Sequence, residues 1–277
     1  MRPMEALQME FVRNALWAGV LVSIACGIMG ALVVVNRIVF ISGGIAHAAY
    51  GGIGLAIYVG ISPLLGATLF SVFIALLMGL FTFGNREGSD TVIGVMWAAG
   101  MGLGIILVDL TPGYHPDLMS YLFGSILAVS KIDLCFMALL DGLIVLVIVL
   151  FYKELLSFSY DDTFSATRGV PVRVLHFLLL VLIALSVVML IRIVGLILVI
   201  ALLTIPASIA GQYTFSLKKM MQLGCILGAV FILLGLWLSY RFDMTSGATI
   251  VLVACAAYLL SSAGKTVALH LARRRRS

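Results

Sequence analysis

The fold is decided by the stretch Val174-Leu-His-Phe-Leu-Leu-Leu-Val-Leu-Ile-Ala-Leu-Ser-Val-Val-Met-Leu-Ile191, in which only a histidine and a serine interrupt the apolar residues. An α-helix needs about 17–25 mostly apolar residues to cross the hydrocarbon core of a bilayer. A helix that is apolar on every face must be buried in protein or in lipid. The stretch therefore predicts a transmembrane helix.

Eight further stretches are apolar over a similar length: 14–35, 39–60, 63–83, 91–110, 134–152, 195–213, 220–240 and 245–263. The chain of 277 residues is 63% hydrophobic and 10% charged, with a mean hydropathy of +1.22. Soluble domains have about 45–50% and about 25% of such residues. We expect an all-α polytopic membrane protein with about eight to nine transmembrane helices, forming a single domain over residues 1–277 in the cell (inner) membrane.

The first residues and the cysteines add two expectations. Residues 1–16 mix Glu5 and Glu10 with arginines and do not follow the order of a secretory leader, so we expect the first apolar run to be retained as a helix. The cysteines occur singly in apolar runs without Cys-x-x-Cys spacing, and we expect them to be small core residues with no disulfide or metal role. They are Cys26, Cys135, Cys225 and Cys255.

The lysine and arginine distribution predicts the orientation, because cytoplasmic loops carry an excess of these residues. With residues 153–173 placed in the cytoplasm, twelve basic residues fall inside: Arg37, Arg86, Lys153, Arg168, Arg173, Lys218, Lys219, Lys265 and Arg273 to Arg276. Five fall outside: Arg2, Arg13, Lys131, Arg192 and Arg241. We expect an outer N-terminus and an inner C-terminus whose arginines contact anionic membrane lipid and no nucleic acid.

Two segments between the apolar runs have features of their own. Residues 119–129 are apolar but too short to span, which favours a re-entrant or interfacial piece. In the polar loop 153–173, residues 160–163 offer N-cap candidates for a short helix over 164–167, and Gly169 before Pro171 is a stop signal. Such a capped helix suits docking on another protein; the alternative is an ordinary cytosolic connector.

His47 lies in the glycine-dense run 41–54, where an ionisable group would be held at membrane depth. Ionisable groups in a bilayer are costly and are functional candidates by default. The alternative is a histidine hydrogen-bonded to a neighbouring helix. The small residues of the run, and a proline in a later apolar run, are candidate hinge positions because they permit helix bending. They are Gly43, Gly44, Gly51, Gly52 and Pro206.

Three regions of the chain resemble the permease subunit of bacterial ABC transporters for zinc, manganese and iron. Ile41-Ser-Gly-Gly-Ile-Ala-His-Ala48 looks like the family's Ile-Ser/Gly-Asp-Ala-Leu-Ser-His-Ala segment. Asp117-Leu-Met-Ser-Tyr-Leu-Phe-Gly-Ser-Ile-Leu-Ala-Val129 is similar to its Asp-Leu-Met-Ser-Tyr-Leu-Phe-Gly block. Residues 152–172 resemble its coupling-helix loop, and residues 194–207 follow its Val-Gly-x-x-Leu-Val-x-x-Leu-Leu-x-x-Pro-Ala pattern.

The resemblance implies a homodimeric permease that works with two cytoplasmic ABC ATPase subunits and an extracytoplasmic metal-binding protein. The chain has no Gly-x-x-x-x-Gly-Lys-Ser/Thr loop, so we expect a transporter and not an enzyme, with ATP hydrolysis in a separate subunit. We expect a transported divalent metal and no permanently bound cofactor. The expected ATPase-coupling residues are Tyr160, Asp161, Asp162, Phe164, Arg168 and Gly169.

His47 is the leading metal ligand under this resemblance. The family pairs this histidine with an aspartate four residues earlier, where this chain has Gly43. Four other residues are further candidate metal ligands, each with a structural or solvated alternative: Asp141, Asp109, His115 and Asp117. His176 and His270 are expected to be interfacial histidines and not ligands.

The ligand chemistry favours zinc first, with manganese or iron next, because imidazole without a neighbouring carboxylate is softer than the oxygen-rich sites that manganese prefers. A different class, a self-sufficient secondary transporter or channel, remains the alternative. An intramembrane metalloenzyme is disfavoured since the chain has no His-Glu-x-x-His or comparable ligand pair.

Overall fold

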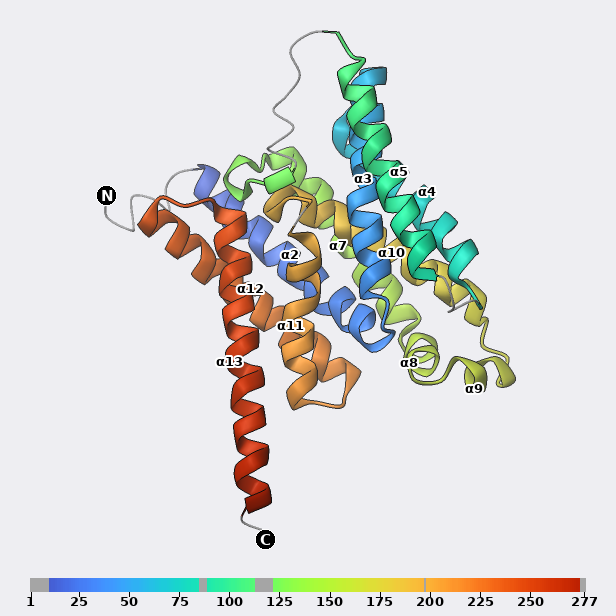
Figure 1. Cartoon of the computed structure of the whole chain (residues 1–277), viewed down its shortest axis with the longest axis vertical. Coiled ribbons are helices and arrows are strands. Elements are labelled where there is room, and N and C mark those ends of the chain that lie inside the picture. Colours follow the sequence, from blue (N-terminus) through green and yellow to red (C-terminus); the bar gives the residue numbers. More distant parts are fainter. Residues whose placement is uncertain (1–9, 85–88, 113–121, 197, 275–277) are drawn as a thin grey trace.

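The computed structural model describes residues 10–84, 89–112, 122–196 and 198–274, and these residues form helices joined by short turns (Figure 1). The helices are α2 (Glu10–Val35), α3 (Val39–Val59), α4 (Pro63–Thr82), α5 (Ser89–Asp109), η1 (Ile126–Ala128), α7 (Lys131–Leu150), α8 (Tyr152–Tyr160), α9 (Asp162–Thr167), α10 (Val172–Val194), α11 (Val199–Tyr213), α12 (Leu217–Phe242) and α13 (Ser246–Arg274).

Among the described residues, eight helices are long and apolar enough to cross a membrane: α2, α3, α4, α5, α7, α10, α12 and α13. The prediction of an all-α polytopic membrane protein is confirmed. The predicted span at 195–213 is wrong as a full crossing, because α11 has 15 residues. At 1.5 Å per residue it is about 22 Å long, which is shorter than the hydrocarbon core.

A break at Gly195 shortens this span. α10 ends at Val194, and Gly195 takes a φ of +77°, which a side chain would strain. Gly124, with a φ of +66°, packs its backbone directly against Gly195. The described part of the predicted re-entrant piece 119–129, including the single turn η1, therefore packs against the break between α10 and α11. Residues 119–121 lie outside the described residues.

The helices form an inner and an outer group. α2, α3 and α10 are mostly buried, and the other five membrane-length helices expose apolar side chains such as Leu69, Leu139 and Trp237. Side chains of this kind are compatible with lipid, which is as apolar as they are. Cys26 is buried as expected, but Cys135 is exposed on α7, so the prediction of core cysteines is wrong there. Its apolar neighbours gave no signal of which helix face meets lipid.

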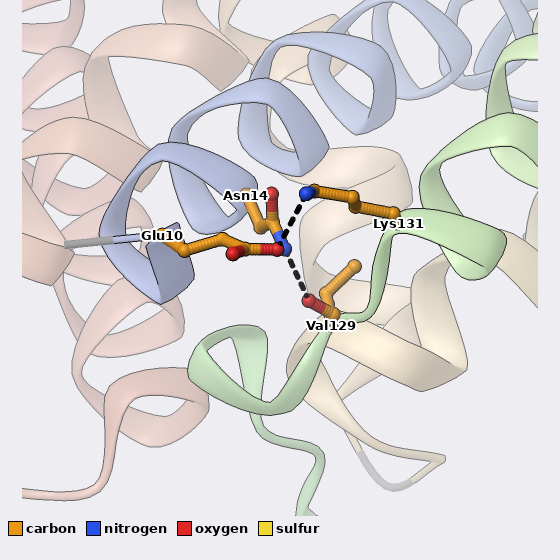
Figure 2. A network of polar contacts seen from close by, with 4 residues as sticks. All are labelled: Glu10, Asn14, Val129 and Lys131. Atoms are coloured by element: carbon orange, nitrogen blue, oxygen red, sulfur yellow. Dashed lines mark hydrogen bonds and ion pairs between the residues drawn. The ribbon is translucent and has the colours of Figure 1, made fainter.

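Polar contacts join α2 and α7 at one end of the bundle. The Glu10 carboxylate lies 2.9 Å from the Lys131 ammonium, and the Asn14 amide donates a hydrogen bond to the Val129 carbonyl at 3.2 Å (Figure 2). The ion pair is exposed, so it contributes little to stability. It does show that the start of α2 and the start of α7 lie at the same end.

Other contacts define the opposite end. The Asn36 amide donates to the Ser159 hydroxyl at 2.9 Å, and the Tyr160 hydroxyl donates to the Phe215 carbonyl at 2.9 Å. The Lys265 ammonium donates to a carbonyl near the end of α11 at 3.0 Å. The turns after α2 and α11 therefore lie beside α8, at the end toward which α13 runs (Figure 1). Of the basic residues that we assigned to the cytoplasm, Arg37, Lys153, Arg168, Lys218 and Lys265 lie on these turns or on the helices that adjoin them.

Candidate functional site

His47 lies within α3, eight residues after its first residue, Val39. At 1.5 Å per residue this is about 12 Å along the helix, near the middle of a bilayer, where transport sites collect. The side chain is 8% exposed. The structure therefore places the imidazole inside the protein, on a helix long enough to cross a membrane.

Close backbone contact between α3 and α5 brings a tryptophan against this histidine. A Cβ on Gly54 would collide with the backbone of Gly104, and one on Gly104 would collide with the backbone of Tyr50. Small residues permit such an approach. α3 and α5 run parallel to each other. Residues in contact between the two helices are about fifty positions apart in the sequence, as His47 and Trp97 are.

The His47 and Trp97 rings are stacked, with centroids 4.0 Å apart and planes 11° from parallel. The Trp97 Nε1–H donates to the Met101 sulfur at 3.2 Å. His47 Nδ1 is buried and has no hydrogen-bond partner among the described residues. The alternative of a histidine hydrogen-bonded to a neighbouring helix is thus not supported. The sequence analysis missed Trp97, although it lies eight residues into its helix, at the depth of His47.

The place of the family's aspartate is filled by an isoleucine from α11. A Cβ on Gly43 would lie 2.5 Å from Cδ1 and 3.1 Å from Cγ1 of Ile200. The described residues contain no group of three or more His, Cys, Asp or Glu side chains that could hold a metal ion. Within this part of the chain, one protomer therefore offers a single imidazole and no complete coordination shell.

Asp141 does not join His47. It lies on α7, is 4% exposed, and has no hydrogen-bond partner for either carboxylate oxygen among the described residues. α7 packs against α2 and α10, and the thiols close enough to interact with the carboxylate are those of Cys26 and Cys225. A carboxylate hydrogen-bonded to serine or threonine, the structural alternative, is not supported.

The remaining candidates are scattered. Asp109 is exposed at the end of α5. His115 and Asp117 lie outside the described residues, as does the side chain of His270. His176 is packed against phenylalanine rings on three segments, Phe83, Phe158 and Phe177, which indicates a packing role.

The candidate hinge glycines are packing positions in a continuous helix. α3 runs unbroken through them, and a Cβ on Gly44, Gly51 or Gly52 would collide with α4 or α5. Pro206 is buried within α11. Their role as hinges remains a prediction, and the contacts indicate that they set helix spacing.

The loop 153–173 contains two helices, α8 and α9. The Asp161 carboxylate accepts a hydrogen bond from the Phe164 backbone at 2.8 Å and caps α9, and Gly169 has a φ of +79° just after the helix. The predicted short helix and its caps are confirmed, while the nine residues of α8 were missed. Phe164 is 51% exposed, with the Arg168 guanidinium 5.1 Å from its ring centroid. This face is available to a partner.

Eight membrane-length helices, a histidine buried among them and a capped helix at one end define a multi-pass membrane protein with a candidate site inside the bundle. The comparisons identify its family. The ABC 3 transport family matches residues 8–265, and the chain belongs to it. It is therefore a permease subunit of an ABC transporter and not an enzyme, with ATP hydrolysis in a separate subunit.

Three relatives illustrate the match. An uncharacterized membrane protein of Synechocystis sp. is 55% identical over 259 residues, covering 94% of this chain and 92% of the relative. The manganese transport system membrane protein MntC of Halalkalibacterium halodurans is 34% identical over 257 residues, covering 93% and 88%. The solved structure of PsaBC from Streptococcus pneumoniae in complex with Fab superposes with a TM-score of 0.84 at 34% identity, covering 93% of each chain.

Proposed function

We propose that this permease carries manganese into the cell in an ATP-driven importer, with His47 as its intramembrane ligand. The observation that carries the proposal is the match over 93% of the chain to a manganese transport protein, together with a histidine buried at mid-depth. The expectation of zinc rested mostly on Gly43. The relatives favour manganese, so zinc and iron become the competitors in the test.

A homodimer is part of the proposal because one chain offers a single imidazole. On α5, Gly94, Ala98 and Gly102 recur every four residues, and a Cβ on either glycine would meet nothing within 4 Å. Small residues at this spacing support close helix pairing. A twofold axis along this face would bring α5 and the adjacent His47 of both copies together. Ala98→Cys should then form a disulfide-linked dimer in membranes, and Leu139→Cys on α7 is the matched exposed control.

The cytoplasmic partner of α8 and α9 is an ABC ATPase subunit, and the outer partner is a metal-binding protein. The exposed ring of Phe164, its contact with Arg168 and the cap at Asp161 give α9 a rigid, partly apolar face. The arginines at the C-terminus would contact anionic lipid. Asp109, His115 and Asp117 remain candidates for receiving metal at the outer end.

The decisive experiment is metal uptake by the permease reconstituted with its ATPase and binding protein, with manganese, zinc and iron in competition. We expect manganese uptake that zinc and iron inhibit only in excess. His47→Ala should reduce uptake at least tenfold while ATPase binding persists, and His176→Phe, which keeps the ring packing, is the matched control. Unchanged uptake in His47→Ala would remove this residue from the pathway.

Docking is tested separately. Asp162→Lys reverses a charge on α9 and leaves the Asp161 cap in place, and Asp243→Lys makes the same change at the opposite end of the bundle. We expect only Asp162→Lys to reduce co-purification with the ATPase and transport coupled to ATP hydrolysis. Equal behaviour of the two variants would contradict docking through α9.

A further inference from the structure

The geometry points to Trp97 as a positioning residue that holds the His47 imidazole in place and leaves Nε2 as the nitrogen that meets the metal. This inference rests on the proposed role of His47 as a ligand. It adds a residue that lies on a different helix and whose side chain has no strong metal-binding atom. Trp97 acts through His47 and not on the metal.

The indole is fixed from two helices. It stacks on His47 at 4.0 Å and also contacts Phe40, whose ring centroid lies 6.2 Å away at an interplanar angle of 50°. Phe40 and His47 are seven residues apart, which is two turns on one face of α3. From its own helix the indole donates its N–H to Met101, at 3.2 Å. Trp97 therefore has little freedom to move away from the imidazole.

Stacking on Trp97 takes the place of the hydrogen bond that normally orients a metal-binding histidine. Such a histidine normally donates its second ring N–H to a carboxylate, carbonyl or water, which fixes the ring orientation. Here Nδ1 is buried and has no partner among the described residues, so no hydrogen bond performs this task. Contact between two nearly parallel rings restricts the imidazole instead. Because Nδ1 is closed off, a metal that approaches without rearranging the helices meets Nε2.

The indole face also favours a charged imidazole. Aromatic rings carry negative charge on their faces, and tryptophan attracts cations most strongly. An imidazole bound to a dication carries part of the positive charge, so the stacked indole stabilises the metal-bound form. The chemical class of ligand that this arrangement suits is a divalent metal ion.

Substitutions separate positioning from simple packing. Trp97→Leu keeps an apolar side chain but removes the aromatic face, Trp97→Phe keeps a smaller ring, and Met101→Leu removes only the sulfur acceptor. Loss of groups that orient a metal ligand lowers metal affinity about 10–100-fold. We expect Trp97→Leu to raise the KM for manganese by about that factor with kcat nearly unchanged, and the other two to have smaller effects in the same direction. Trp237→Phe, at an exposed tryptophan, is the matched control.

Fluorescence gives a readout that does not depend on transport. The chain has three tryptophans, so Trp17→Phe with Trp237→Phe leaves Trp97 as the only tryptophan of the full-length permease, whose emission is measured on the purified chain in detergent. We expect its emission to change on addition of manganese or zinc chloride, and to stay constant with magnesium chloride. Adding His47→Gln should abolish the change, while Met101→Leu should alter the emission before metal is added.

The outcomes distinguish the two proposals. If His47→Ala abolishes uptake but folded Trp97→Leu keeps a normal KM and Trp97 emission ignores manganese, the positioning role is wrong and the ligand role survives. If His47→Ala transports normally, the ligand role itself fails. If Trp97→Leu does not fold, the KM of Trp97→Phe and the emission of Trp97 test the positioning role instead. An emission that manganese does not change would overturn the inference.

Discussion

Gly43→Asp should strengthen manganese binding and weaken the fold, for two separate structural reasons. The new carboxylate would lie one helical turn before His47, on the same face of α3. A dication bound by the imidazole would gain an anionic oxygen ligand of the kind that manganese prefers. We expect the KM for manganese to fall about tenfold, equivalent to about 1.4 kcal/mol, and the preference for manganese over zinc to increase.

The expected loss of stability in Gly43→Asp comes from a collision with Ile200. A Cβ at position 43 would lie 2.5 Å from the end of this side chain, well inside ordinary contact, so Cδ1 must move. Overpacking costs about 1–3 kcal/mol, and the low end applies here because the colliding atom is the end of a flexible side chain. Ile200→Val removes the colliding Cδ1 atom. The double variant should therefore recover about 1 kcal/mol or more in a double-mutant cycle, since the two residues are in contact.

Two measurements separate these effects. Thermal unfolding of the detergent-solubilised protein reports stability, and manganese uptake by the reconstituted complex reports the KM. Gly43→Ala is the control, because it makes the same contact with Ile200 without a carboxylate and should leave the KM unchanged. If Gly43→Asp and Gly43→Ala show the same KM and the same metal preference, position 43 is not a vacant ligand position and the reasoning is refuted.

Three further changes test other elements. Asp141→Leu should raise the thermal stability by about 1–3 kcal/mol, since it removes a buried carboxylate without hydrogen bonds; lower stability would mean that the carboxylate has a partner beyond the described residues. Asp161→Ala should cost about 1 kcal/mol of local stability through loss of the cap, seen as faster amide exchange at Phe164, whereas Asp161→Asn should not. Tyr160→Phe removes the hydrogen bond to Phe215, worth about 0.5–1.5 kcal/mol, and should lower uptake per ATP hydrolysed without loss of ATPase binding.

The membrane fold could be predicted because each apolar run is long enough to form a membrane-spanning helix. Recognising such a run requires no knowledge of the helices that pack against it. The prediction was wrong at 195–213 for a reason that lies outside the run. The helix breaks at Gly195, and the backbone at Gly124, seventy-one residues earlier, packs against the break. That contact joins segments distant in the sequence, so the apolar run itself does not show it. The nine residues of α8 were missed because the helix is short and follows directly after the apolar helix α7.

The candidate site was predictable only in part, for the same reason. His47 is recognisable because an ionisable group in an apolar run is costly. Trp97 has no such signal, and its importance comes from glycine contacts that set α3 and α5 in register. Asp141 has the sequence signal of a ligand, because it lies in an apolar run, but it does not join His47. It lies on α7, which packs against α2 and α10. The sequence gives the position of a residue along its own helix, but it does not show which residue of another helix faces it.

α11 connects the two regions that the function requires. Near its first turn, Ile200 lies against Gly43, four residues before His47 in α3. Just beyond its last residue, Tyr213, the carbonyl of Phe215 accepts the hydrogen bond from Tyr160 at the end of α8. Coupling between sites is carried by rigid elements that contact both. A displacement of α11 would change both contacts together, and this helix of 15 residues is the route that we propose between α8 and the neighbourhood of His47.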